Sequence, residues 1–210
     1  MQNASGLKQY VFIFLAGLFL NSPLAHSLAI DLQPASIIAG SGDSVSFDVN
    51  ISGLGDFGPD SLGAFDVTVG FDPGSLSFTS YTLGDFLGLE GFGEALDISF
   101  GDLGGAVNIA QISFLFDFEL DALQPGSFTL ATLNFTVDSL GAGQSTVLSI
   151  FQDAILSDAY GDPLVPTSFG TALIEGRTNV PLPGTVPLFA IAALGLWLSR
   201  RSQFSRHRAS

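Results

Sequence analysis

Alternation of apolar and polar residues with a period of two dominates the central part of this 210-residue chain. In the stretch SVSFDVNIS, the apolar positions are Val45, Phe47, Val49 and Ile51, and every residue between them is polar. Successive side chains of a β-strand point to opposite faces, so this pattern is typical of a strand with one buried and one wet face. The pattern therefore constrains the chain to fold mainly as half-buried β-strands.

Turn residues separate the alternating stretches. A second stretch, 65–71, ends at Asp72-Pro73-Gly74, where Pro fixes φ and Gly accepts a positive φ. The alternation resumes at Leu76 and Phe78, and later short strands are expected at 147–151 and 171–174. About nine short strands with turn signals between them predict an all-β sandwich. Since the region 30–176 contains fifteen of the twenty Phe residues, we expect a core rich in Phe, Val, Leu and Ile.

Two stretches depart from simple alternation. In SFTLATLNFTV, the apolar phase changes at Ala131 and Thr132, which predicts either a β-bulge or a strand that passes from one sheet to the other. The stretch 87–96 carries the only helical pattern of the region, and it is a weak one.

A row of acidic residues follows one face of another expected strand. Apolar residues alternate from Ile112 to Leu120, so the intervening Asp117, Glu119 and Asp121 would project from the opposite face about 6.8 Å apart. We interpret these three carboxylates as candidate partner-binding residues for a basic or metal-bearing partner. The alternative is an ordinary solvated outer face.

The charge distribution excludes several classes of function. All twenty acidic residues lie between Asp31 and Glu175, and no Lys or Arg occurs between Lys8 and Arg177. Such a domain cannot hold phosphate backbones by counterion release, so nucleic acid is excluded as a partner. It also lacks Cys and His, and therefore thiolate nucleophiles and imidazole bases. We expect no enzyme. A carboxylate pair that hydrolyses glycosides is the remaining catalytic alternative, disfavoured because the domain has no Trp for sugar stacking.

Three acidic residues in the stretch FQDAILSDAYGDPL raise calcium binding as a hypothesis. Asp153, Asp158 and Asp162 lie close in sequence, where Gly161 and Pro163 signal a tight loop. Ca²⁺ takes oxygen ligands, and no internal cation balances the acidic residues, although the spacing does not fit the EF-hand loop. The alternative is that these Asp residues cap their own turns.

The two ends of the chain differ from its centre. Residues 1–29 contain one Lys, an apolar run from Tyr10 to Leu20 and then small residues, which is the order of a secretory signal peptide. Near the other end, the apolar stretch 188–198 would form a helix of roughly 16 Å, short for a hydrocarbon core of ~30 Å. Basic residues follow it and would hold the tail 199–210 in the cytoplasm.

The central region resembles the first part of a cohesin-type domain. The stretches SGDSVSFDVNISGL and LGAFDVTVGFDPGSLSFTSYTLGDFL carry the resemblance, which covers about 30–175. The matching positions are Gly42, Asp43, Phe71, Asp72, Pro73, Leu76, Leu83, Gly84 and Asp85. The resemblance implies a jelly-roll β-sandwich of about nine strands and a non-catalytic module that binds dockerin partners. No motif aligns with the family's partner-binding face, so no binding residue is transferred.

The segment VPLPG, the apolar stretch after it and the Arg cluster resemble a PEP-CTERM sorting signal. The residues concerned are Val180, Pro181, Leu182, Pro183, Gly184, Arg200 and Arg201, with Leu182 in place of the usual Glu. The resemblance implies processing by an exosortase-like enzyme in a Gram-negative bacterium that secretes polysaccharide. The alternative is that the apolar stretch stays as a permanent single-span anchor. The expected organisation is a signal peptide at 1–29, a sandwich at 30–176, a linker and sorting motif at 177–187, a transmembrane helix at 188–198 and a basic tail.

Together these features predict an exported, envelope-sorted binding module that recognises a dockerin-like protein or an extracellular polysaccharide. The alternative is a structural component of the exopolysaccharide or biofilm matrix without a discrete protein ligand.

We predict that the mature protein lacks both ends, because each apolar run is too short for a stable membrane span. Mass spectrometry of the protein recovered from the cell surface or the medium measures its two termini. An intact tail from Arg200 to Ser210 would contradict the sorting signal.

Overall fold

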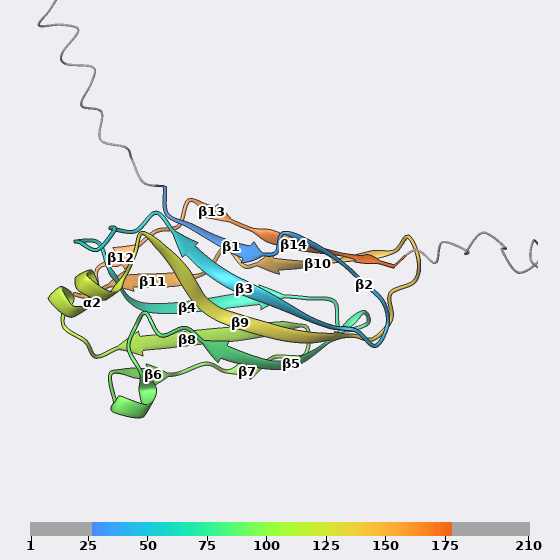
Figure 1. The fold of residues 1–210 in the computed structure, drawn as a ribbon, viewed down its shortest axis with the longest axis horizontal. Coiled ribbons are helices and arrows are strands. Elements are labelled where there is room, and N and C mark those ends of the chain that lie inside the picture. Colours follow the sequence, from blue (N-terminus) through green and yellow to red (C-terminus); the bar gives the residue numbers. More distant parts are fainter. Residues whose placement is uncertain (1–26, 178–210) are drawn as a thin grey trace, which may run out of the picture.

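Two β-sheets face each other in the computed structural model, which describes residues 27–177 (Figure 1). The segment 1–26, the VPLPG motif, the apolar stretch 188–198, Arg200 and Arg201 lie outside the described residues. Within 27–177, none of the helices is long and apolar enough to cross a bilayer.

The first sheet has five strands in the order β13-β1-β3-β9-β5. Their bounds are β1 Ala29–Gln33, β3 Ser44–Ser52, β5 Leu76–Leu83, β9 Ser127–Val137 and β13 Ser168–Phe169. β1 begins within the segment that we expected to belong to the signal peptide, and the Leu28 carbonyl accepts a hydrogen bond from the Thr167 N–H at 2.8 Å. The sandwich therefore includes Leu28 and Ala29.

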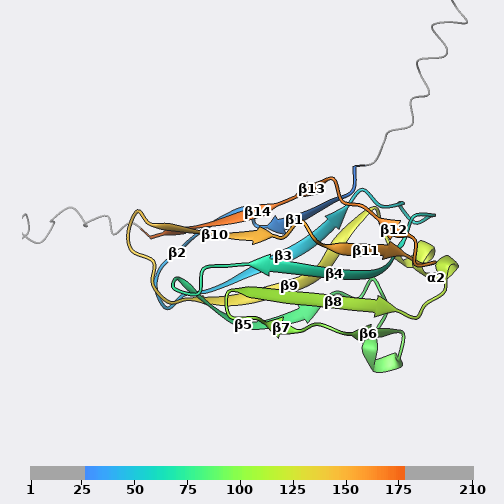
Figure 2. The ribbon, with the colours of Figure 1, turned by 180° about the vertical axis from the view of Figure 1, so that it is seen from behind.

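The second sheet has nine strands, with the order β12-β11-β4-β10-β14-β2 along its main path. Strand β8 lies beside β4, and both β6 and β7 pair with β8 (Figure 2). The bounds are β2 Ser36–Ala39, β4 Leu62–Gly70, β6 Ala95–Asp97, β7 Gly101–Asp102, β8 Ala106–Ser113, β10 Ser145–Ile150, β11 Ile155–Asp158, β12 Pro163–Leu164 and β14 Thr171–Gly176.

The first and last parts of the domain both cross from one sheet to the other. At the start, β1 pairs with β3 in the first sheet and β2 pairs with β14 in the second. At the end, β13 pairs with β1 in the first sheet and β14 pairs with β10 in the second. At the second crossing, the Gly170 N–H donates to the Ile30 carbonyl at 2.8 Å, and a Cβ on Gly170 would lie 2.9 Å from the Asp31 Cα. Only glycine allows this approach. Together with the short strands β6, β7 and β12, these crossings raise the number of strand segments in 27–177 to fourteen, above the predicted nine or so.

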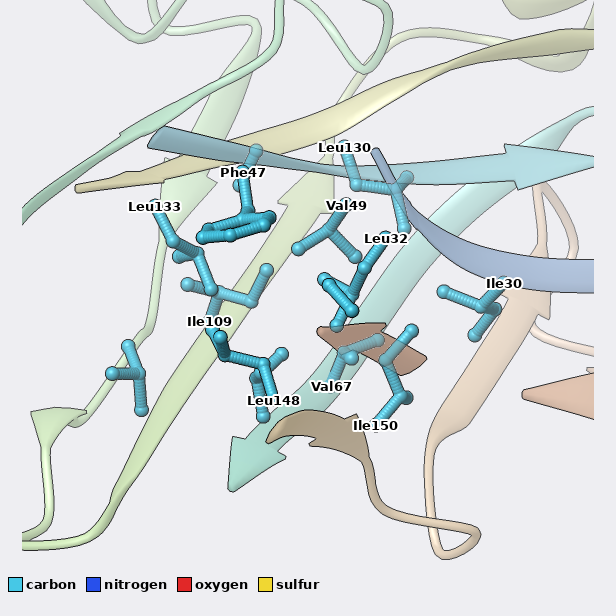
Figure 3. Packing of buried hydrophobic residues seen from close by; sticks show 14 of the residues in the cluster. Ile30, Leu32, Phe47, Val49, Val67, Ile109, Leu130, Leu133, Leu148 and Ile150 are labelled. Atoms are coloured by element: carbon cyan, nitrogen blue, oxygen red, sulfur yellow. The ribbon is translucent and has the colours of Figure 1, made fainter. Parts of the chain in front are cut away.

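The inner faces of the two sheets form one apolar core (Figure 3). Phe47 and Val49 of β3, Val67 of β4, Ile109 of β8 and Leu133 of β9 are at most 1% exposed. The expectation of a Phe-rich core is only partly right, because seven of the fifteen Phe residues are exposed. These are Phe57, Phe92, Phe100, Phe114, Phe116, Phe118 and Phe151.

The predicted irregularity in β9 is a β-bulge, and the strand remains in the first sheet. Val49 pairs with Ala131 while the next residue, Asn50, pairs with Thr129, so Leu130 has no partner in the ladder. Both Leu130 and Ala131 are buried, at 1% and 0% exposure. The extra residue shifts the alternation of apolar residues by one position, which is the phase change predicted at Ala131 and Thr132.

The expected strand from Ile112 to Leu120 is wrong. β8 ends at Ser113, and the chain then forms helix α2, Asp117–Leu123. Acidic residues favour a helix N-terminus, and the Glu119 carboxylate accepts a hydrogen bond from the Phe116 N–H at 2.9 Å. Of the apolar row, only Leu120 is fully buried, at 0% exposure. The helical pattern at 87–96 is likewise mostly wrong, since it yields only the short 3-10 helix η1, Glu90–Phe92, and the strand β6.

Gln124, at the end of α2, joins three parts of the chain and is 1% exposed. Its Oε1 accepts a hydrogen bond from the Leu62 N–H at 2.6 Å, and its Nε2 donates to the carbonyls of Leu62 at 2.8 Å and Phe86 at 2.9 Å. We predict that Gln124→Leu lowers the free energy of unfolding by about 2–4 kcal/mol, because it leaves buried backbone groups unpaired.

Equilibrium unfolding in urea measures this change, with Gln144→Leu as the matched control. Gln144 accepts one hydrogen bond, from the Gly141 N–H at 2.8 Å, in an exposed turn, so its replacement should cost less than about 1 kcal/mol. Equal losses for the two variants would contradict the role of Gln124.

Candidate functional site

The outer face of the second sheet around β4 is built from cross-strand rows of side chains. One row runs Ser157, Ala64, Ile112 and Leu96 across β11, β4, β8 and β6; a second runs Ile155, Asp66 and Ala110; a third runs Thr68, Asn108 and Gly101. Directly opposite residues share a face of the sheet. The alternate residues, such as Phe65, Val67 and Ile109, are in the core, so these rows point outward. We call this surface the β4–β8 face.

Apolar side chains on both sides of the β4–β8 face are open to solvent. Ile155 is 67% exposed at the β11 side, and Leu96 is 48% exposed at the β6 side. The Phe151 ring lies over Gly70 of β4, because a Cβ on that glycine would be 2.5 Å from the ring. Phe100, exposed as well, lies just before β7. The face therefore offers separated apolar contacts rather than one continuous pocket.

A polar group fixes the centre of the same face. The Asn108 Nδ2 donates to Asp66 Oδ1 at 2.6 Å and to Thr68 Oγ1 at 3.2 Å, and its Oδ1 accepts from the Phe100 N–H at 3.0 Å. Asn108 is buried, whereas Asp66 is half-buried. An apolar surface with a few rigidly placed polar groups is typical of protein-binding sites.

The acidic residues predicted to bind a partner do not lie on the β4–β8 face. Asp117, Glu119 and Asp121 belong to α2, so the even spacing along a strand is wrong. Glu119 caps the helix. Asp117 accepts a hydrogen bond from the Tyr160 hydroxyl, which lowers the pKa of Asp117 and raises the pKa of Tyr160. Asp121 lines a cavity of about 260 Å³ together with Asp60 and Asp158.

Exposed aromatic side chains accompany α2. Phe114, Phe116 and Phe118 are at least 60% exposed, and the rings of the last two stack with centroids 5.7 Å apart. The Phe114 N–H donates to the Glu94 carbonyl at 2.7 Å, which holds this segment beside the start of β6. The apolar surface therefore continues from Leu96 towards this end of the sandwich.

The three residues of the calcium hypothesis are not brought together as a metal site. Asp158 Oδ1 instead accepts hydrogen bonds from the Tyr160 N–H at 2.9 Å and the Asp162 N–H at 2.8 Å. Throughout residues 27–177, no three His, Cys, Asp or Glu residues are grouped so that they would hold a metal ion. The arrangement favours the alternative, in which Asp158 caps its own turn.

Comparisons with known proteins bear on the fold. No protein-family model and no curated protein matches the sequence. Among solved structures, the sixth cohesin of scaffoldin B from Acetivibrio cellulolyticus, in complex with a Cel5 dockerin, is similar to this chain. The TM-score is 0.54 and the identity 21%, over 72% of this chain and 98% of the cohesin.

Two further cohesins have similar structures. For the seventh ScaB type I cohesin from Pseudobacteroides cellulosolvens, the TM-score is 0.56 at 13% identity, over 74% of this chain and 96% of that one. For a type II cohesin domain from the cellulosome of Acetivibrio cellulolyticus, the TM-score is 0.54 at 19% identity, over 70% of this chain and 94% of that domain. The expected fold is confirmed. The described domain is a cohesin-like jelly-roll β-sandwich.

Sequence reasoning missed the β4–β8 face. Its residues come from β4, β6, β8 and β11, and only the pairing register places Ile155 beside Asp66 and Leu96 beside Ile112. The alternation of β4 did signal that Asp66 and Thr68 point away from the core. No local pattern marks Asn108 as their partner.

We predict that Asp158→Ala destabilises the domain by about 1–2 kcal/mol, because two backbone N–H groups lose a charged acceptor. Thermal unfolding should show the same loss in CaCl₂ and in NaCl of equal ionic strength. A midpoint for the unmutated domain that rises more with Ca²⁺ than with Na⁺, and no longer does so in Asp158→Ala, would support the calcium hypothesis instead.

Proposed function

We propose that this domain is a non-catalytic module that holds a partner protein on the β4–β8 face. The observation that carries the proposal is the set of exposed apolar side chains, Ile155, Leu96 and Phe151, around the fixed Asp66 and Asn108 group. Covering such exposed apolar side chains with a partner removes them from water and so favours binding. Fold similarity to cohesins crystallised with dockerins makes a dockerin-like protein the proposed class of partner.

The charge of the domain indicates the chemistry of that partner. Residues 27–177 contain twenty acidic residues and one basic residue, Arg177, which pairs with Asp43 at 2.8 Å. A partner with an apolar centre and basic residues around it would complement this surface and associate faster at low ionic strength. Acidic partners would be repelled.

Export and sorting form a second part of the proposal, and they rest on the sequence of the two ends. The signal-peptide pattern of 1–29 supports passage through the inner membrane of a Gram-negative bacterium. The VPLPG segment with Arg200 and Arg201 supports processing by an exosortase-like enzyme, with transient membrane attachment through 188–198. The domain would then act at the cell surface, in the envelope or in the medium.

The experiment that tests the partner proposal passes extracts of the bacterium that produces the protein over the immobilised mature protein. The unmutated protein and the variant Ile38→Glu should enrich the same partner, whereas Ile155→Glu and Leu96→Glu should not. Ile38, on β2, is 64% exposed and so is closely matched to Ile155 at 67%. With the purified partner, calorimetry should show at least about tenfold weaker binding for Ile155→Glu, a change of about 1.4 kcal/mol.

The alternative functions give different results in the same experiment. Enrichment of polysaccharide without a protein, unaffected by Ile155→Glu, would favour the matrix component. Turnover of oligosaccharides would favour the glycosidase. Equal capture of one protein by all four forms would place its binding site elsewhere on the domain.

A further inference from the structure

A cleft of about 420 Å³ lies on the opposite side of β6 from the β4–β8 face. β5, β6 and β7 run along the same edge of the sandwich (Figure 2), and the cleft lies between β5 and the β6–β8 pair. Its polar lining includes Tyr81, Asp85, Glu90, Asp97 and Gln111. Asp97 follows Leu96 in β6, so the alternation of the strand sends Leu96 outward and Asp97 into the cleft.

Gln111 is the residue that distinguishes this cleft from other acidic parts of the surface. It pairs with Phe65 on one side and with Asp97 on the other, and therefore projects from the inner side of β8. Its side chain is 2% exposed, and its Oε1 is the only buried side-chain nitrogen or oxygen of residues 27–177 without a hydrogen-bond partner. Because buried polar groups are nearly always paired, an unpartnered amide oxygen in a cleft wall points to a ligand with N–H or O–H donors.

The carboxylates of the cleft are acceptors too. Asp97 Oδ1 accepts from the Ser99 N–H at 2.8 Å and Oδ2 accepts from the Tyr81 hydroxyl at 2.7 Å. Burial of Asp97 favours its neutral form, but the hydrogen bonds from Ser99 and Tyr81 outweigh this and lower the pKa, so the group is a carboxylate at neutral pH. Asp85 and Glu90 are exposed and form no ion pair within 27–177.

The chemistry of these groups selects the class of ligand. Carboxylates and an amide oxygen around one cleft attract a cation that brings several N–H donors. A bare metal ion would need a tighter set of ligands, and no three carboxylates of the described residues form one. A guanidinium group provides five donors at fixed angles and is weakly hydrated, so it suits a cleft with dispersed acceptors.

We propose that the cleft between β5 and β6 binds the side chain of an arginine supplied by a partner protein. Gln111 Oε1 and the carboxylates of Glu90, Asp85 and Asp97 accept the N–H groups. This site is separate from the β4–β8 face, and it does not require that the face bind a dockerin-like protein.

The test uses the mature protein and a small probe, N-acetyl-arginine amide, followed by NMR. The probe should shift the Gln111 side-chain amide resonances and those of neighbouring backbone groups in a saturable way. Gln111→Leu and Glu90→Gln should each weaken the probe at least fivefold. The control Asp153→Asn removes the same charge as Glu90→Gln from an exposed loop outside the cleft and should change the affinity by less than twofold.

Other probes define the results that overturn the proposal. Tetramethylammonium carries the same positive charge but has no N–H donors. Equal resonance shifts with it would show that the cleft attracts any cation and would contradict recognition of the guanidinium group. Saturable binding of Ca²⁺ at the same residues, with no binding of the arginine probe, would make the cleft a metal site. Ile155→Glu should leave the probe affinity unchanged, so a failure of this proposal and a failure of the β4–β8 proposal are distinguishable. Glu90→Gln keeps the test valid if Gln111→Leu does not fold.

Discussion

Burial of the inner faces of the two sheets against each other is the interaction on which the rest of this domain depends. The chain has no Cys, so no disulfide joins the sheets. The only ion pair within 27–177, between Arg177 and Asp43, is largely exposed and contributes at most about 1 kcal/mol. The apolar rows of β3 and β9 therefore have to meet those of β4 and β8 closely. The crossings from β1 to β2 and from β13 to β14 hold the sheets in that position, and Gly170 allows the second crossing to pass close to Asp31.

A core that needs no ion pairs leaves the acidic residues free for local roles, and many have one. Asp72 accepts hydrogen bonds from the Ser75 hydroxyl at 2.6 Å and the Gly74 N–H at 3.0 Å, which lower its pKa. Asp102 and Asp158 accept from backbone N–H groups two residues further along. Turn N–H groups thus supply the positive partial charges that Lys or Arg would supply elsewhere. This explains how a domain with one basic residue folds despite its charge.

The sequence predicted most reliably those features that depend on one strand alone. The half-buried strands β3 and β4, the turn at Asp72 and the bulge in β9 all follow from local periodicity and turn chemistry. Helix α2 was missed because Phe114 and Phe116 before it and Phe118 within it alternate like a strand but are exposed. The decisive contacts are the capping bond of Glu119 and the burial of Leu120 and Gln124. The capping bond is local, but the buried contacts of Gln124 depend on Leu62 of β4 and on Phe86, which are distant in sequence.

Both candidate sites depend on pairing across strands, which explains why neither was visible beforehand. Strand β6 is the clearest case, because its register against β8 determines two surfaces at once. Leu96 opposite Ile112 extends the apolar face, while Asp97 opposite Gln111 lines the acidic cleft. A shift of one residue would exchange these environments and would place Asp97 on the apolar face and Leu96 in the acidic cleft. The Tyr81 and Ser99 hydrogen bonds hold Asp97 inward, so the same contacts that shape the cleft also leave Leu96 exposed on the β4–β8 face.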